Sequence, residues 1–182
     1  ATLTVNPVFV AAGLSKLWSL APGSRPYLTI ASLANERGMA YDPMTRRVVL
    51  VSRTAPSVYV LDADSGADLW TLSTSGISGG TYTLLMVGVA DDGAVYAGNL
   101  TTAGSTTAFK LYRWANSTSA AVPAVAFSGD PSPGNNQRWG DTLDVRGAGT
   151  NTQVIIGTRS GTNVAILTTV DGTTFAAKSI NV

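Results

Sequence analysis

The sequence predicts an all-β fold built from repeated four-stranded antiparallel sheets, and three observations lead to that prediction. Residues 37–72 contain four short apolar segments separated by turn residues. The segment Gly38-Met39-Ala40-Tyr41-Asp42 recurs 50 positions later as 88–92, and more weakly as 141–145. No stretch keeps a helical spacing of apolar residues over about ten positions. Four strands in a unit of this size match one blade of a β-propeller.

The first complete blade, residues 36–74, has turn signals between its predicted strands. Proline in Asp42-Pro43 has the fixed backbone angle that suits the second position of a turn. The apolar run Val48–Val51 is expected of a strand that is covered on both faces. Residues 62–66 supply turn-forming carboxylates and a glycine. The predicted strands are Gly38–Tyr41, Arg47–Arg53, Val58–Leu61 and Leu69–Leu72.

Two further blades and a fragment account for the rest of the chain, which we expect to form a single domain over residues 1–182. Asp92-Gly93 predicts a hairpin turn in the second blade, and Asp171-Gly172 predicts one in the third. In the second blade, residues 84–128, the predicted strands are Leu84–Ala90, Ala94–Leu100, Phe109–Ala115 and Val122–Phe127. In the third blade, residues 141–182, they are Asp141–Val145, Gln153–Thr158, Val164–Thr169 and Phe175–Ile180. Residues 1–35 are interpreted as a partial blade and a connection, with strands at Thr2–Val10 and Ser15–Leu20.

Three blades and a fragment do not close a ring. Known propellers use about four to eight blades, and closure buries the faces between blades and protects their edges. The exposed edges therefore predict association with a second copy in a homo-oligomer, with further copies in a polymer, or with the missing part of the same propeller. Two copies would supply about six full blades.

Composition excludes several function classes. The chain is 45% apolar and 13% charged, and its net charge of +1 arises from 12 basic and 11 acidic residues. No basic run is longer than Arg46-Arg47, so a nucleic-acid partner is not expected. The sequence has neither Cys nor His, which excludes disulfides, thiolate or histidine-bound zinc, and catalytic triads with histidine. The longest apolar run, Leu84–Ala90, is too short to span a membrane.

The surface is expected to be rich in Ser, Thr, Asn and Gly. Polarity with little charge is common in secreted bacterial proteins, so a secreted, extracellular or cell-surface location is predicted. Ala1 is compatible with a mature chain from which a signal peptide has been removed.

Several motifs resemble the β-propeller superfamily. Residues 58–70, VYVLDADSGADLW, are similar to the blade motif of quinoprotein-type and related repeat propellers, in which a strand ends in an Asp-containing turn, a Gly and a strand with Trp. The wider pattern of RGMAYDP, MVGVADDGAVYAGNL, FKLYRWAN and RWGDTLDVRG resembles secreted bacterial propeller domains of unassigned activity. The resemblance extends from about Asn35 to the C-terminus and implies about half a propeller. The ligand set of quinone-dependent members has no counterpart here, so that activity is not carried over.

Three aspartates have the spacing of a calcium loop. Asp62, Asp64 and Asp68, with Gly66 between them, alternate along the chain as carboxylate ligands of a hard cation do. The glutamate that closes an EF-hand loop is absent, and an ordinary hairpin turn explains the same residues. The turn is the favoured interpretation, so no cofactor is expected, and calcium is the alternative.

A second candidate site lies in the connections between blades. It consists of Tyr82, Asn136, Arg138, Trp139 and Asp141. The resemblance places these connections on the face where propellers usually bind ligands, and aromatic rings with a polar rim suit a glycan or a peptide. In the alternative, which we favour, Trp139 packs between blades and Arg138 pairs with Asp141.

Two acceptor sequences for N-glycosylation start at Asn99 and Asn116. Glu36 is the only glutamate, so the sequence offers little support for the paired carboxylates of a glycosidase.

The leading hypothesis is a non-catalytic extracellular structural module that assembles through exposed blade edges. The alternative is a propeller domain that binds a glycan or peptide. A hydrolase or calcium-dependent enzyme is less favoured, so the sequence leaves enzymatic activity undecided and favours its absence.

Overall fold

The fold was obtained as a computed structural model, which describes residues 13, 15–29, 35–53 and 55–182. These residues form three four-stranded antiparallel sheets and one short 3₁₀ helix, η1 (Gly149–Asn151). The first sheet contains β1 (Glu36–Asp42), β2 (Arg47–Ser52), β3 (Ser57–Asp62) and β4 (Asp68–Leu72). The second contains β5 (Tyr82–Val89), β6 (Val95–Leu100), β7 (Phe109–Trp114) and β8 (Ala124–Gly129). The third contains β9 (Thr142–Arg146), β10 (Gln153–Gly157), β11 (Asn163–Thr169) and β12 (Phe175–Asn181).

The twelve strands predicted for the three complete blades are confirmed, and their observed ends lie within two residues of the predicted ones. The strand expected at Ser15–Leu20 is wrong, because this segment is irregular; the one expected at Thr2–Val10 lies outside the described residues. Trp18 shows what holds the segment instead. Its Nε1 donates a hydrogen bond to the carbonyl oxygen of Ala63 at 2.8 Å, and its ring lies against Gly66. Contact with the β3–β4 turn, and not strand pairing, places this part of the chain.

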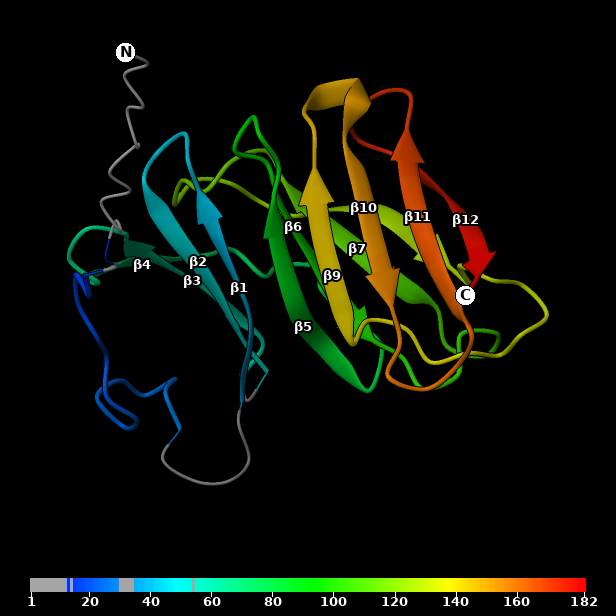
Figure 1. Cartoon of the computed structure of the whole chain (residues 1–182), viewed down its shortest axis with the longest axis horizontal. Coiled ribbons are helices and arrows are strands. Elements are labelled where there is room, and N and C mark those ends of the chain that lie inside the picture. The colour runs from blue at the N-terminus through cyan, green and yellow to red at the C-terminus, as the bar shows by residue number, and fades with distance from the viewer. Residues whose placement is uncertain (1–12, 14, 30–34, 54) are drawn as a thin grey trace, which may run out of the picture.

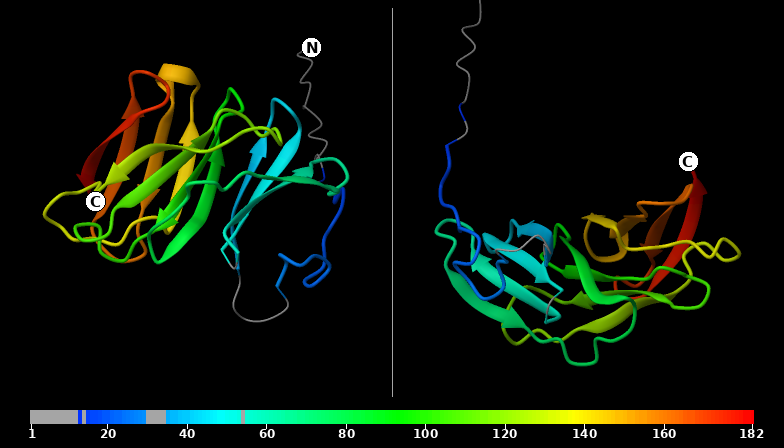
Figure 2. Two further views of the ribbon diagram at one scale, coloured as in Figure 1. Left: turned by 180° about the vertical axis from the view of Figure 1, so that it is seen from behind. Right: turned by 90° about the horizontal axis from the view of Figure 1, so that it is seen from below.

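Within each sheet the strands lie in chain order, and β1, β5 and β9 are the inner strands of their blades. β1 packs beside β5, and β5 packs beside β9, so the inner strands lie side by side (Figure 1). The two further views show the sheets standing as blades of an open arc (Figure 2). The fold is therefore of propeller type without closure into a ring. Among the described residues, no helix has the length and apolar character needed to cross a membrane.

Two apolar cores hold the blades together. The first lies between the first and second blades and includes Val49, Val51, Leu84 and Trp114. The second lies between the second and third blades and includes Phe109, Trp139, Ile156 and Leu167.

Among the described residues, neighbouring blades cover the second blade on both faces and each of the other two on one face. All six residues of β6 are buried. In β10, by contrast, Ile155 is exposed between buried Val154 and Ile156, because only one face of the third blade meets a neighbour. Burial along these strands thus follows the number of neighbouring blades.

The first blade shows the same asymmetry and corrects one expectation. In β2, Val49 and Val51 are buried against the second blade, whereas Val48 and Leu50 on the opposite face are half-buried. β2 was expected to be covered on both faces from its continuous apolar run. That expectation is wrong, because the described chain supplies a neighbouring blade on one side of β2.

Glycines in the repeated segment let the inner strands approach one another. A Cβ added at Gly38 in β1 would lie 2.4 Å from the backbone nitrogen of Val87 in β5. A Cβ added at Gly88 in β5 would lie 2.5 Å from the side chain of Val145 in β9. The recurrence of glycine at 38 and 88 therefore reflects the convergence of strands toward the centre of the arc.

Candidate binding pocket at the start of the inner strands

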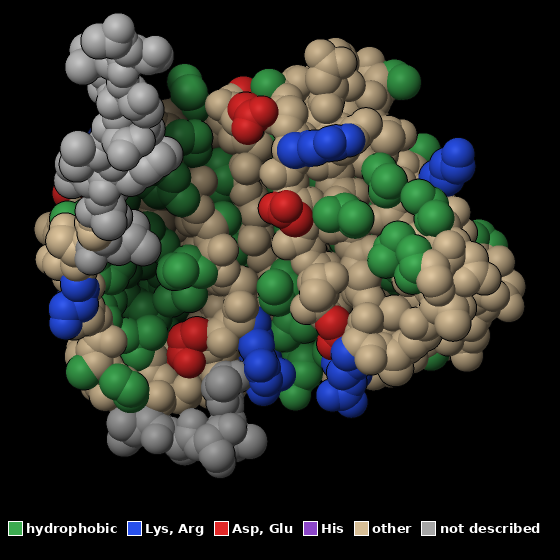
Figure 3. Space-filling model, viewed as in Figure 1, with side chains coloured by type: hydrophobic (Ala, Val, Ile, Leu, Met, Phe, Trp, Pro, Cys, Tyr) green, Lys and Arg blue, Asp and Glu red, His purple; other side chains and the backbone are tan. Residues whose placement is uncertain are grey.

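A recess of about 560 Å³ lies where the inner strands begin, and residues of all three blades line it. Figure 3 shows basic side chains on both sides of an apolar patch at this lower edge of the molecule. A volume of this size is within the range of small-molecule sites in proteins. Its lining comprises Arg37, Arg53, Thr81, Tyr82, Leu85, Met86, Leu100, Arg138, Asp141, Thr142, Thr158 and Arg159.

The connection before β9 is held in place by its backbone. Trp139 and Thr101 exchange two backbone hydrogen bonds, of 2.9 and 3.1 Å. Gly140 follows with φ of 97°, and an added Cβ there would lie 2.0 Å from the carbonyl oxygen of Asn99. Only glycine fits such a close approach at this backbone angle. These contacts fix the positions from which Arg138 and Asp141 enter the recess.

Arg138 and Asp141 form a bidentate ion pair at the wall of the recess. Both hydrogen bonds, from Nε and from Nη2 of Arg138, measure 2.7 Å. The two side chains are mostly buried, with exposed fractions of 18% and 15%. The hydrogen bonds to Asp141 raise the pKa of Arg138 above its ordinary value. This pair is thus better ordered than a typical surface ion pair.

The pKa of Asp141 reflects opposing effects. Burial alone would raise it, but the hydrogen bond from the Arg138 guanidinium and the one from the backbone nitrogen of Arg159, at 3.0 Å, both lower it. The positive charges of the same two arginines lower it further. The net result is a pKa below the ordinary value, so Asp141 is ionised at neutral pH.

Arg53 and Tyr82 form another part of the lining. Arg53 follows β2 directly, and its backbone nitrogen donates to the carbonyl oxygen of Asn35 at 3.0 Å. Tyr82 is the first residue of β5, and the guanidinium carbon of Arg53 lies 4.4 Å from the centre of its ring. A cation over an aromatic face at this distance is attracted by the ring. This contact places a positive charge over an aromatic ring at one side of the recess.

The structure brings together three of the five residues predicted as a ligand site. Tyr82, Arg138 and Asp141 line the same recess. Asn136 lies in an adjoining recess of about 370 Å³, which Arg138 also lines. Trp139 is fully buried in the core between the second and third blades, as in the favoured alternative.

The three aspartates of the calcium hypothesis have separate partners. Asp62 Oδ1 accepts hydrogen bonds from the backbone nitrogens of residues 64 and 65, which is turn geometry. Asp64 pairs with Arg46, and Asp68 pairs with Arg25. Among the described residues, no three acidic side chains lie close enough together to hold a metal ion.

The two glycosylation acceptors differ in accessibility. Asn99 is fully buried, and its side chain bonds to the carbonyl oxygen of Ala108 and the backbone nitrogen of Lys110. Asn116 is exposed in the β7–β8 connection, where its Oδ1 accepts hydrogen bonds from Thr118.

Sequence reasoning missed Arg37, Arg53 and Arg159 as members of the pocket. Each is an isolated basic residue in a different connection or strand. One signal was present: Arg53 follows β2 and Arg159 follows β10, so both come after the second strand of a blade. Superposing the repeats would have placed two guanidinium groups at corresponding positions of the first and third blades.

Comparison with known proteins identifies the family of the chain. A crystal structure of a DUF4623 family protein from Bacteroides eggerthii is similar, with a TM-score of 0.66 and 23% identity over 81% of this chain. The present chain spans 35% of that protein's length. A PQQ-bound aldose sugar dehydrogenase from Streptomyces coelicolor has a TM-score of 0.47 and 17% identity over 74% of this chain and 44% of its own, which is too remote to inform on the present protein.

Among curated proteins, none matches the chain. A family model described as a domain of unknown function matches residues 18–181, nearly the whole sequence, and the chain therefore belongs to the DUF4623 family.

Proposed function

We propose that the chain is an assembly module whose end blades pack against further blades of the same type, supplied by a second copy of the chain. The observation that carries this proposal is the exposure of apolar faces on both end blades. Within the arc, the equivalent faces are buried between neighbouring blades.

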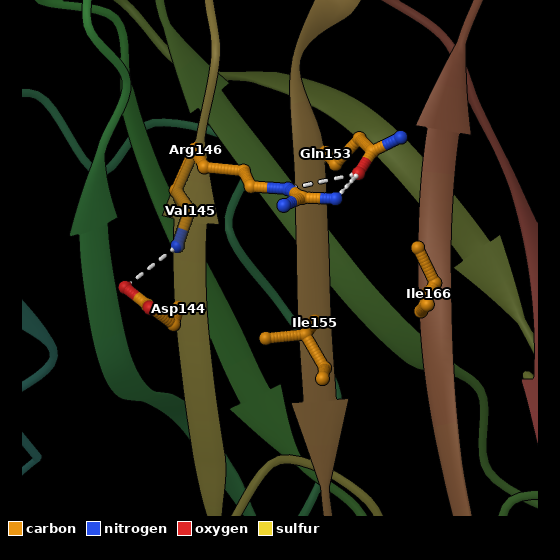
Figure 4. A pocket seen from close by; sticks show the side chains of 6 residues that line it. All are labelled: Asp144, Val145, Arg146, Gln153, Ile155 and Ile166. Atoms are coloured by element: carbon orange, nitrogen blue, oxygen red, sulfur yellow. Dashed lines mark hydrogen bonds between the residues drawn. The ribbon is translucent and has the colours of Figure 1, made fainter.

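On the third blade the open face is centred on two isoleucines. Ile155 in β10 lies directly opposite Ile166 in β11, and Ile155 is 46% exposed. They line a recess of about 280 Å³ (Figure 4), with Asp144, Arg146 and Gln153 as its polar residues. An apolar centre with a polar rim is the usual composition of a protein interface.

On the first blade the open face lies over β1 and β2. Met39 is 70% exposed and pairs in register with Leu50, and Tyr41 is 51% exposed and pairs with Val48. Hydrophobic side chains gather over this blade in the space-filling view (Figure 3).

Residues 15–29 cover the outer part of the same face. Tyr27 stacks on Tyr59 with 3.9 Å between ring centres. The part that the described residues leave open is therefore the inner half, next to β1, where a neighbouring inner strand would pack in a closed propeller.

A dimer can bury the open faces of both the first and the third blade. If the third blade of each copy packs on the first blade of the other, two identical contacts related by a two-fold axis close a ring of about six blades. Each large apolar side chain buried this way contributes about 1.5–3 kcal/mol.

The test is the mass of the purified chain, 18.7 kDa as a monomer, by light scattering over a wide concentration range. A dimer is expected, and Ile155→Asp is expected to dissociate it because a carboxylate would be buried without a partner. Val122→Asp is the matched control. Val122 is 67% exposed and lies in the β7–β8 connection, away from both open faces. A monomer at every concentration, or an Ile155→Asp variant that dimerises like the parent, would overturn the proposal.

Ligand binding is the second candidate function, and a separate observation favours it. Tyr82 converges with Arg138 and Asp141 on one recess, although Tyr82 lies in the preceding blade and far from the other two in the sequence. A glycan or peptide remains the ligand class that the sequence predicts for this surface.

A further inference from the structure

The recess at the start of the inner strands concentrates positive charge. Arg37, Arg53, Arg138 and Arg159 line it, against the single carboxylate of Asp141. The excess is three positive charges, while the whole chain has a net charge of +1. The charge is therefore a local property of this site and not of the surface in general.

Three of these arginines have no carboxylate partner. All eleven acidic residues of the chain lie in the part that the structure describes. The ion pairs within 4.0 Å there join Arg25 to Asp68, Arg46 to Asp64 and Arg138 to Asp141. Glu36, the acidic neighbour of Arg37 in sequence, bonds to Thr29 and is not part of the lining.

Like charges collected in one recess repel each other, and in folded proteins such clusters are commonly relieved by a bound counter-charge. Guanidinium groups match carboxylates, phosphates and sulfates because their paired N–H donors suit two oxygens of one acidic group. The apolar floor of Leu85, Met86 and Leu100 would contact the carbon skeleton of such a ligand.

The geometry points to a binding site for a small organic anion that carries at least two acidic groups. Arg37, Arg53 and Arg159 bind the acidic groups, and Tyr82 holds the Arg53 guanidinium over its ring. Arg138 is already neutralised by Asp141 and shapes the wall. The site is separate from the open face of the third blade, because Ile155 and Ile166 do not line it.

The experiment is isothermal titration calorimetry of the full chain with citrate and, separately, with inorganic pyrophosphate; neutral maltotriose is the control ligand. Saturable binding of at least one anion is expected, with weaker affinity at higher salt, because solvent ions screen partly exposed charges. Comparison of the two anions distinguishes a carboxylate from a phosphate site. Absence of saturable binding for both anions, or equal binding of maltotriose, would overturn the inference.

Variants assign the binding to this recess. Arg53→Gln and Arg159→Gln are each expected to weaken binding about tenfold or more, since each removes a charge-assisted hydrogen bond. Arg113→Gln is the matched control: Arg113 lies over Tyr96, 5.9 Å from the ring centre, and is not part of the lining. Equal weakening by Arg113→Gln, or unchanged affinity in both pocket variants, would contradict the assignment.

Two further measurements distinguish a loss of anion binding from a loss of folding and from a loss of dimerisation. Arg159 is exposed, and its side chain makes no hydrogen bond to the described residues, so Arg159→Gln is expected to keep the melting temperature of the parent. Ile155→Asp is expected to keep the anion affinity of the parent while changing its mass in solution. Loss of anion binding in Ile155→Asp would overturn the independence of the two sites.

Discussion

The carboxylate of Asp42 accepts a hydrogen bond from the hydroxyl of Ser117, with 2.7 Å between Oδ2 and Oγ, across 75 residues of sequence. Asp42 ends β1 in the first blade, Ser117 lies between β7 and β8 in the second, and both are fully buried. Asp42 also accepts hydrogen bonds from the backbone nitrogen of Met44 and the hydroxyl of Thr45. One side chain thus shapes the β1–β2 turn and attaches it to the next blade.

The second blade repeats this arrangement toward the third. Asp91 accepts a hydrogen bond from the backbone nitrogen of Gly147 at 3.1 Å, and Asp92 accepts one from that of Gly149 at 2.9 Å. Aspartates that the sequence explains as turn formers therefore have a second role at the contacts between blades.

Replacing Asp42 should destabilise the chain strongly. Asp42→Ala removes the carboxylate that accepts hydrogen bonds from the hydroxyls of Ser117 and Thr45, and the expected loss in the free energy of unfolding is about 2–4 kcal/mol. Urea denaturation measures it. The exposed ion-pair residue Asp64 is the control, for which alanine should cost less than about 1 kcal/mol. A double-mutant cycle with Ser117→Ala should show coupling, and purely additive effects would contradict the inter-blade bond.

Gly38 should not tolerate a side chain. Gly38→Ala forces a methyl group against the backbone of β5, so we expect a loss of about 1–3 kcal/mol in the free energy of unfolding. Gly129→Ala is the control, because a Cβ there would meet Phe127 at an ordinary contact distance of 3.5 Å. Equal stability of the two variants in urea would show that the inner strands can separate without cost.

The contribution of Asp141 to the free energy of unfolding should be lost in acid. Its pKa is lowered in the folded chain, so its contribution is complete above the ordinary carboxyl value of about 4 and is lost as the pH falls through the folded-state value. Asp141→Asn should be less stable than the parent at pH 7 by about 1–3 kcal/mol, and the difference should shrink as the pH falls below about 4. Urea titrations at several pH values test this. A difference that is constant with pH would exclude a role for ionised Asp141.

The two glycosylation acceptors should behave differently in a eukaryotic secretory host. Asn116 is exposed and should carry a glycan in the folded, secreted protein, whereas Asn99 is buried and should not. Peptide mapping by mass spectrometry locates the modified residue. A glycan at Asn99 in folded material would contradict the burial of that side chain.

The strands were predictable from sequence because short apolar runs and turn residues are local signals. Asp92-Gly93 and Asp171-Gly172 end strands where the pattern places the turns. The strand expected at Ser15–Leu20 is absent for a non-local reason. A segment that resembles β4 in sequence forms a strand only where a partner strand is present, and Trp18 instead docks on a turn. The expectation that both faces of β2 are covered was wrong for a similar reason: an apolar run does not tell how many blades pack against the strand.

The candidate pocket was predictable only in part. Arg138 and Asp141 stand near each other in sequence, and their pairing follows from opposite charge. Arg37, Arg53 and Arg159 meet through the packing of three blades, which a single sequence does not reveal. The burial of Trp139 likewise depends on side chains from two blades.

The order of the blades makes the chain a short linear array. In the described part of the chain, the second blade has two neighbouring blades and each end blade has one. In such an array stability is approximately a sum of unit and nearest-neighbour terms, so opening starts at the ends. Backbone amides of β6 therefore exchange with solvent deuterium more slowly than those of β1 or β12, and a partner that covers an end blade would remove that gradient.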